Sequence, residues 1–308
     1  MGRPGRGLRM KVGVTVPNFG PAATADSLRA WAAVVEDAGF DFLMVGDHVA
    51  ATPDVTAAYP GPFWEPLTLL GYLAGVTRRV ELGTTVLVVP YRDPLLTARS
   101  LAGLDQLSDG RLVVGVGVGW ADEEFAAVGV DPRRRGEITD EYLRALLALW
   151  SDDVVSFAGR HVAFTDVDTR PRPLRRPHPP LWVGGNGAAA RRRAVRFGDA
   201  WHPLRTPAGW LAAVGLPGLR AAAEEAGAPV PALAPRVVLH PTAELRPDDD
   251  RLTGEGRPDQ IRADLDALRE LGATHVLLDT HRDAASAARD DHAALRAIVE
   301  DAAGWLAS

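Results

Sequence analysis

The amino-acid sequence predicts an α/β protein folded as a single (β/α)8 barrel. Apolar strand-like runs alternate with amphipathic helical runs from end to end, eight such pairs occur, and the chain of 308 residues has the length of one large domain. A doubly wound sheet shares this alternation and stays open as the alternative. We see no domain boundary, so residues 10–308 form the expected barrel domain, preceded by a flexible leader at residues 1–9.

Each predicted strand is a short apolar run, which is typical of a buried strand. The eight strands are expected at residues 11–16, 42–45, 80–89, 111–119, 180–185, 199–204, 236–241 and 275–280. The sixth of these has the weakest pattern.

The helices between the strands are indicated by apolar residues three and four positions apart. In the first helix these residues are Leu28, Trp31, Val35 and Ala38, and Gly39 is a suitable C-terminal cap. The remaining helices are expected around residues 67–74, 94–107, 138–149, 188–198, 219–227, 261–268 and 290–305.

One segment breaks the alternation between the fourth helix and the fifth strand. Residues 152–166 have the pattern of a hairpin that turns at Ala158-Gly159. Residues 171–180 carry too many prolines for a helix or a strand ladder and predict an extended connector. We therefore expect an insertion over one end of the barrel.

Composition excludes several classes of function. The net charge is −6 and the pI is about 5.8, which argues against a nucleic-acid partner because such surfaces carry a basic excess. The chain has no cysteine, hence no disulfide, thiolate nucleophile or thiolate metal ligand. No apolar run approaches the ~20 residues that span a bilayer, and no signal-peptide core is present. A cytoplasmic protein without a membrane partner is expected.

Asp47 and His48 follow directly on the second strand. In a barrel the active site lies at the carboxyl ends of the strands, and a histidine there can give or take a proton near neutral pH. Asp47 would then bind a donor group of a ligand. The alternative is that the pair merely caps the next element.

A glycine-rich turn, Gly184-Gly185-Asn186-Gly187-Ala188, leads from the fifth strand into a helix. Backbone N–H groups at a helix start, free of bulky side chains, bind anions, and phosphate sites after late barrel strands are frequent. A plain glycine turn without a ligand remains the alternative.

Other motifs are absent or rejected. The glycines of "VGVGVGW" (114–120) lie inside a strand at every second position, whereas a dinucleotide fingerprint needs them at a helix start. We expect these glycines to clear one face for a flat ring. The sequence has no histidine spacing typical of a metal site and no Gly-x-Ser-x-Gly elbow.

Five stretches resemble the bacterial-luciferase-like flavin monooxygenase superfamily, and within it the coenzyme F420-dependent oxidoreductases. They are residues 45–49 ("VGDHV"), 63–77, 82–120, 134–150 and 180–203, in the order of the family. The resemblance implies a TIM-type barrel that binds a reduced flavin or deazaflavin, acts on a small molecule and forms a homodimer.

The resemblance also implies roles for single residues. It implies that His48 lies near the reactive ring, that Asp47 bonds the ring region, and that a bulge with a cis peptide bond at Thr85–Val86 supports the ring. It further implies that residues 184–188 bind the cofactor phosphate and that Arg135, close to the position of a phosphate-contacting arginine of the family, also binds the cofactor. Substrate is expected beside Trp120, Trp201 and His202.

The chain departs from the family pattern at Trp120. Several members have a carboxylate there that serves as an acid, whereas here the nearest carboxylates are Glu123 and Glu124. The expected function is an F420-dependent oxidoreductase that transfers hydride. A monooxygenase that uses reduced FMN is the first alternative, and a non-catalytic flavin- or deazaflavin-binding protein is the second.

Overall fold

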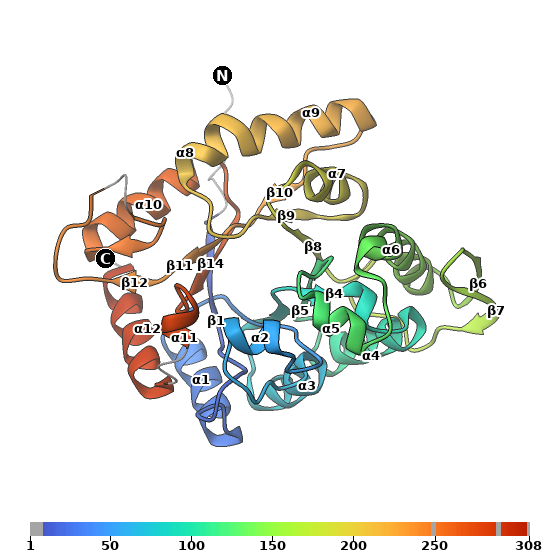
Figure 1. Ribbon diagram of the computed structural model, residues 1–308, viewed down its shortest axis with the longest axis horizontal. Coiled ribbons are helices and arrows are strands. Elements are labelled where there is room, and N and C mark those ends of the chain that lie inside the picture. Colours follow the sequence, from blue (N-terminus) through green and yellow to red (C-terminus); the bar gives the residue numbers. More distant parts are fainter. Residues whose placement is uncertain (1–8, 248–250, 288–290, 307–308) are drawn as a thin grey trace.

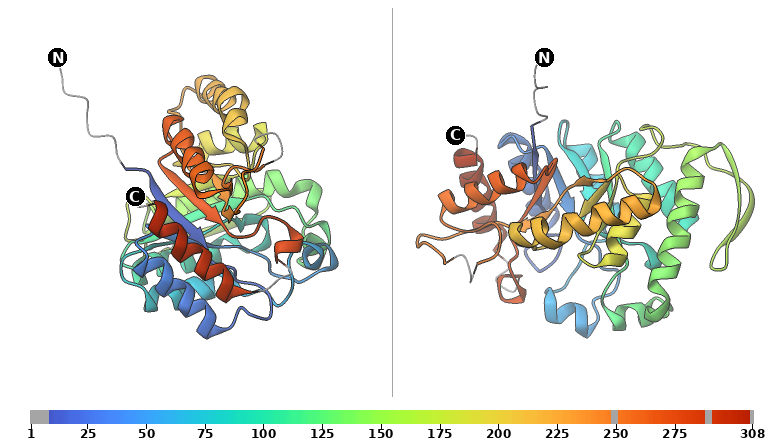
Figure 2. Two further views of the ribbon diagram at one scale, coloured as in Figure 1. Left: turned by 90° about the vertical axis from the view of Figure 1, so that its left-hand side faces the viewer. Right: turned by 90° about the horizontal axis from the view of Figure 1, so that it is seen from above.

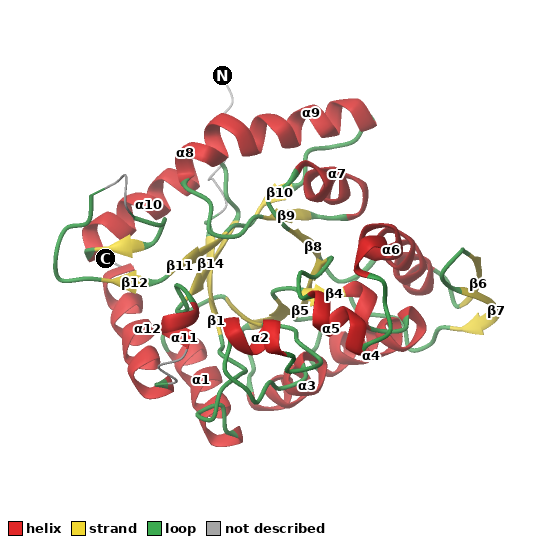
Figure 3. Cartoon of the chain, in the orientation of Figure 1, coloured by secondary structure: helices red, strands yellow, loops and turns green. Residues whose placement is uncertain are grey.

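The computed structural model describes residues 9–247, 251–287 and 291–306, and the α/β class and the (β/α)8 barrel are confirmed (Figures 1 and 3). All of the predicted leader except Arg9 lies outside the described residues. The strands of the barrel are β1 (Lys11–Thr15), β2 (Phe42–Val45), β3 (Glu81–Thr84), β5 (Leu112–Gly117), β8 (Leu181–Gly184), β9 (Ala200–His202), β11 (Arg236–Val238) and β14 (His275–Asp279).

The barrel closes between its sixth and seventh strands. Neighbouring strands are parallel in the order β9-β8-β5-β3-β2-β1-β14-β11. The seventh strand is interrupted before Arg236, and its first part, β10 (Ala232–Leu233), pairs with β9. Arg236 N–H donates to the Pro203 carbonyl and Arg205 N–H donates to the Arg236 carbonyl, both at 2.8 Å. These bonds join the two ends of the sheet.

A layer of helices surrounds the strands (Figure 3). Its members are α1 (Ala25–Asp37), α3 (Pro66–Val76), α4 (Pro94–Leu107), α6 (Arg135–Ser151), α7 (Ala188–Phe197), α9 (Leu216–Ala226), α10 (Pro258–Glu270) and α12 (His292–Leu306). The first and last helices lie side by side (Figure 2). Among the helices described, none combines the length and apolarity needed to cross a membrane.

The strand pleat divides the core into two parts. Phe42, Met44 and Trp182 belong to a small cluster that fills the inside of the barrel. Leu43 and Val45, one residue on, join the larger cluster between strands and helices. This is the expected consequence of side chains that alternate between the two faces of a strand.

Short elements decorate the loops. They are α2 (Pro53–Ala58), α5 (Asp122–Ala127), α8 (Ala208–Trp210), α11 (Ala284–Ala287), the 3₁₀ turns Val89–Tyr91 and Pro132–Arg134, a π-helical turn (Leu211–Gly215), and the strands β4 (Leu87–Val88), β12 (His240–Pro241) and β13 (Glu255–Gly256).

The predicted hairpin is confirmed as β6 (Val154–Ala158) and β7 (Ala163–Asp168), but it stands away from the barrel beyond α6 and not over one end of the barrel as expected (Figure 1). The Glu141 carboxylate of α6 accepts hydrogen bonds from the backbone N–H groups of Arg160, His161 and Val162 in the hairpin turn, at 2.6–2.9 Å. Residues 171–180 form neither helix nor strand, as their prolines predict.

The third strand is broken at a cis peptide bond between Thr85 and Val86, which confirms that prediction. The glycines of β5 make room for this break. A Cβ atom on Gly115 would lie 1.9 Å from the Thr84 carbonyl oxygen, and one on Gly117 would lie 2.4 Å from Val86 Cγ2. The alternating glycines therefore serve first to seat the third strand against the fourth.

The crowding at Gly115 predicts a large effect of a single methyl group. Gly115→Ala should lower the free energy of unfolding by at least about 3 kcal/mol, because the new Cβ meets backbone that cannot move aside cheaply. Gly103→Ala, inside α4 with no atom near its Cβ position, should instead raise it by about 1 kcal/mol. Urea denaturation of both variants checks this, and equal effects would contradict the packing described.

Candidate active site

A cavity of about 300 Å³ opens at the carboxyl ends of the strands. The carboxyl ends of seven strands contribute to its wall, the seventh strand contributes Arg236 from its start, and the apolar residues of the wall include Val16, Phe19, Phe63 and Val86. Within the described part of the chain, no group of three or more His, Cys, Asp or Glu side chains could hold a metal ion. The cavity is therefore an apolar chamber with a few polar groups, which is the usual character of a small-molecule site.

His48 lies in the cavity wall and is held from behind by Glu124. The two are buried, and His48 Nδ1 lies 2.7 Å from Glu124 Oε2. The other oxygen of Glu124 accepts from Val49 N–H at 2.6 Å and Ala50 N–H at 3.0 Å. No described residue forms a hydrogen bond with Nε2, the second ring nitrogen. The ring is thus fixed in orientation, with Nε2 available to a ligand.

The charge of Glu124 is stabilised by the same contacts. Burial raises the pKa of Glu124, but the hydrogen bonds from His48 and from the backbone of Ala50 and Val49 outweigh that effect and lower it. The carboxylate is ionised at neutral pH. It favours a proton on His48 Nδ1, so that any exchange of a proton with a ligand falls to Nε2.

Asp47 has a different environment, although it also lines the cavity. Arg92 donates to both of its carboxylate oxygens, at 2.6 and 2.8 Å, and Val88 N–H donates to one of them at 2.8 Å. Asp47 therefore ties the end of β2 to β4 and the turn that follows it. A contact with the cofactor ring stays a prediction.

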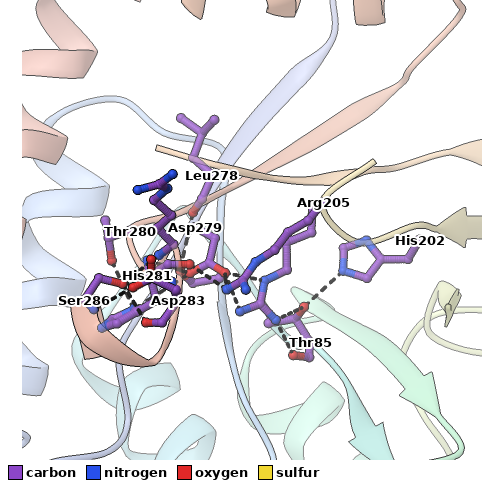
Figure 4. A network of polar contacts seen from close by, with 12 residues as sticks. Thr85, His202, Arg205, Leu278, Asp279, Thr280, His281, Asp283 and Ser286 are labelled. Carbon is purple, nitrogen blue, oxygen red and sulfur yellow. Dashed lines mark hydrogen bonds and ion pairs between the residues drawn. The ribbon is translucent and has the colours of Figure 1, made fainter. Parts of the chain in front are cut away.

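A polar network built on Asp279 forms the opposite wall (Figure 4). Arg236 donates through Nε and Nη2 to Asp279 Oδ2, at 2.9 and 2.6 Å, and through Nη1 to the Thr85 carbonyl at 3.0 Å. Arg205 donates to the carbonyl of His281 at 2.6 Å and to Asp279 at 3.3 Å. The network joins the ends of the third, sixth and eighth strands to the start of β11 in the seventh.

Two pKa values are strongly displaced in this wall. Burial raises the pKa of Asp279, but attraction to Arg236 and contacts with His281 and Arg205 outweigh it and hold it well below its usual range. Burial lowers the pKa of His202 to about 4, and the charge of Arg236 acts in the same direction. His202 is therefore neutral at pH 7. Its Nδ1–H donates to the Ala234 carbonyl, and its Nε2, 3.0 Å away, accepts from the Thr85 hydroxyl.

The glycine turn lies at the edge of the cavity. Gly184, Gly185 and Asn186 belong to the wall, and Gly187 is the N-cap of α7 without a side-chain cap bond. The Asn186 side chain bonds the backbone of Leu204 through both its amide and its carbonyl, at 2.9 and 2.8 Å. The asparagine thus fixes the turn and leaves the first N–H groups of α7 without a side-chain acceptor.

The structure brings most of the predicted site residues together. Those in the cavity wall are Asp47, His48, Thr85, Val86, Trp120, Gly184, Gly185, Asn186 and His202. Gly187 and Ala188 follow at the start of α7. Arg135 begins α6, where its side chain donates to the Pro132 carbonyl at 2.7 Å, and it does not line the cavity.

Trp201 is not brought to the cavity. It is fully buried, packs near Trp210 in the helix layer and donates to the Gly185 carbonyl at 2.8 Å. The reason is the pleat of β9, which directs His202 inward and its neighbour Trp201 outward. Trp201 supports the glycine turn from outside, so the expected substrate contact has no basis in this arrangement.

Sequence reasoning missed Arg92 and Arg236, and it left the role of Glu124 open. Arg236 stands at the start of an apolar run, and this position was the available signal. An arginine beside a buried strand is itself buried in part, and buried arginines require a partner. Glu124 had no such signal. Its contact with His48 spans 76 positions of sequence.

Comparison with known proteins places the chain in a family. The model of the luciferase-like monooxygenase family matches residues 10–253, and the chain belongs to that family. An uncharacterised protein of Mycobacterium tuberculosis is 34% identical over 191 residues, which cover 58% of this chain and 67% of that protein.

Two relatives with named activities use different cofactors. The FMNH2-dependent dimethylsulfone monooxygenase of Pseudomonas putida is 33% identical over 180 residues, covering 58% of this chain and 48% of the enzyme. The F420-dependent glucose-6-phosphate dehydrogenase of Kineococcus radiotolerans is 31% identical over 201 residues, covering 64% and 56%. The chain spans about half the length of each.

Solved structures share the fold over nearly the whole chain. An F420-dependent secondary alcohol dehydrogenase in complex with an F420-acetone adduct superposes with a TM-score of 0.75 at 19% identity, covering 97% of this chain and 99% of the other. A type II Baeyer–Villiger monooxygenase from Pseudomonas putida in complex with FMN gives 0.72 at 17%, covering 94% and 96%.

The low pKa of His202 predicts a specific loss of stability in mild acid. The unfolded chain binds a proton on this histidine near pH 6.5 and the folded chain only near pH 4, so stability falls as pH falls through that window. In wild type, His202 should lower the free energy of unfolding by about 2 kcal/mol between about pH 7.5 and about pH 5. In His202→Gln this part of the decrease should be absent. Urea denaturation at the two pH values measures it, and parallel losses in wild type and variant would refute it.

Proposed function

We propose that this protein is an F420-dependent oxidoreductase that transfers hydride between the deazaflavin and a small organic alcohol or carbonyl compound. The observation that carries the proposal is the buried His48–Glu124 pair, which presents His48 Nε2 to an apolar cavity. A positioned histidine of this kind is a general acid or base.

The residues around the cavity fit a flavin-type ring with a phosphate. On the side of the cavity near Gly117 and Gly184, the Val86 side chain occupies the space that a Cβ atom on either glycine would need. Val86 and the strand ends behind it would form the flat wall against which a ring face lies. The uncapped start of α7 at Gly187 supplies N–H groups for the phosphate.

When bound, the reduced deazaflavin would supply a hydride to a carbonyl carbon and be oxidised, while the carbonyl becomes an alcohol. His48 Nε2 would hold the proton that the carbonyl oxygen takes up, and would accept it back in the reverse direction. Glu124 would keep the ring oriented through its contact with Nδ1. Arg236, Thr85 and His202 would keep the third strand in place beneath the ring.

A reduced-FMN monooxygenase is the second candidate. The phosphate site and the flat wall would serve FMN equally well, and the dimethylsulfone monooxygenase of Pseudomonas putida is as similar in sequence as the F420-dependent relative. A non-catalytic binding protein is the weaker candidate, because the His48–Glu124 pair has the arrangement of working proton-transfer groups.

Substitution of His48 tests the catalytic assignment. His48→Gln should lower turnover with F420 about 10²–10⁴-fold and leave the Kd for the cofactor within about threefold of wild type. Glu124→Gln should cause a smaller loss, about tenfold, with an altered pH profile. Tyr72→Ala, on the outer face of α3, is the control.

The cofactor is decided by titrating wild type with F420 and with FMN, followed by assays of hydride transfer and of oxygen consumption. Tight binding of FMN with oxygen-dependent product formation would replace the first candidate by the second. Full turnover by His48→Gln in a single-turnover assay would move the proton role to another group.

The phosphate assignment predicts opposite effects of one substitution on affinity and on stability. Gly187 has ordinary φ and open space at its Cβ position, and aspartate is a favourable N-cap. Gly187→Asp should therefore raise stability by a few tenths of a kcal/mol but weaken cofactor binding about 10-fold to 100-fold by charge repulsion.

Gly187→Ala is the matched control, since it adds a side chain without the charge. Calorimetric titration and thermal unfolding of the two variants give both quantities. Equal cofactor affinity of Gly187→Asp and Gly187→Ala would show that no phosphate binds at this helix start.

A further inference from the structure

We infer that the substrate is an uncharged, largely apolar ring compound whose single carbonyl or hydroxyl group reaches His48. The placement of the carbonyl or hydroxyl group at His48 rests on the proposed function. The uncharged, apolar character of the substrate follows from the rest of the cavity wall. Two features carry it: a continuous wall of aromatic rings around His48, and the absence of an unpaired charge among the described cavity residues.

The aromatic wall consists of Phe19, Tyr59, Phe63 and Trp120. Phe19 stacks on Phe63 with ring centroids 5.3 Å apart, and its centroid lies 5.1 Å from that of Tyr59. The His48 ring lies 5.0 Å from Phe63 and 5.6 Å from Trp120. The rings come from the loops after three different strands, and those of Tyr59, Phe63 and Trp120 each border the His48 ring.

The wall is pre-formed by backbone bonds. Phe19 and Phe63 form an antiparallel bridge, and Trp64 N–H donates to the Asn18 carbonyl at 2.8 Å. The Asn18 amide in turn donates to the carbonyls of Gly46 and Trp64, both at 2.9 Å. The rings of Phe19 and Phe63 are therefore in place before a ligand enters, and binding does not have to order them.

Trp120 forms the outer end of the wall. Its side chain remains 51% exposed although it lines the cavity, which is unusual for so large an apolar surface. A ligand against its ring would cover that surface and gain the contact energy typical of aromatic pairs.

The charged groups of the cavity are already neutralised within the protein. Apart from histidines, the charged residues described in its wall are Asp47, Arg236 and Asp279. Arg92 binds both oxygens of Asp47, and all three nitrogens of the Arg236 guanidinium donate to Asp279 or Thr85. Away from the start of α7, which the proposed function assigns to the cofactor phosphate, a carboxylate or phosphate of the substrate would lose its hydration without gaining a free cation, which is unfavourable.

A matched pair of ketones tests the substrate class directly. Cyclohexanone and its derivative with a carboxylate opposite the carbonyl share the ring and the reacting group and differ in charge. Titration calorimetry with protein loaded with F420 or FMN, whichever binds, should give a Kd for cyclohexanone at least about tenfold lower than for the carboxylate. Because binding is measured, the test does not depend on turnover.

Two cavity variants sharpen the result. Leu204 lines the cavity mouth and is partly exposed, so Leu204→Arg should tighten binding of the carboxylated ketone about fivefold or more and reverse part of the preference.

Trp120→Ala should weaken cyclohexanone binding about threefold to tenfold. Tyr72→Ala, an equally accessible aromatic outside the cavity, should leave both Kd values unchanged.

The outcomes separate the two proposals. Preference for cyclohexanone without hydride transfer from F420 keeps the substrate class and rejects the proposed function. Equal or tighter binding of the carboxylate by wild type overturns the substrate class, as does failure of both ketones to bind. An unchanged Kd in Trp120→Ala overturns the role of the aromatic wall.

Discussion

The ion pair between Arg236 and Asp279 connects the closure of the barrel with the shape of its active site. The backbone of Arg236 bonds the sixth strand and closes the sheet, while its side chain pairs with Asp279 on the eighth strand and reaches the Thr85 carbonyl on the third. Removal of Asp279 would leave Arg236 as a buried charge without its counterpart, which typically costs several kcal/mol. One pair thus holds three strand ends in register around the cavity.

The His48–Glu124 pair shows how the chain departs from the resemblance that its sequence suggests. The resemblance implies an acid at the position of Trp120, whereas here an aromatic side chain stands there and the carboxylate next to His48 is that of Glu124 in α5. Glu124 lies in α5, contacts His48 Nδ1 at 2.7 Å and is not part of the cavity wall. The acid therefore orients the histidine, and the vacated position becomes part of the aromatic wall.

Elements of local origin could be predicted well. The helices around Trp31 and Leu265 and the hairpin at Ala158-Gly159 depend on residues near one another in sequence, and the structure contains them. The cis bond at Thr85–Val86 was indicated only by the resemblance, because no local feature of the two residues distinguishes it. Trp201 was wrongly predicted to contact the substrate because adjacent residues of a strand face opposite sides of the sheet. So short a strand contains too few residues to show from the sequence which of them face the inside of the barrel.

By itself the sequence determined the alternation of strands and helices, the insertion and the residues that stand at strand ends, since periodicity and turn-forming residues act over short distances. Only the tertiary structure decided which of those residues face one another. The contacts of Glu124 with His48 and of Arg236 with Thr85 join segments 76 and 151 positions apart. Such contacts depend on how the barrel closes and on the direction of each pleat, and neither property belongs to any single stretch of the chain.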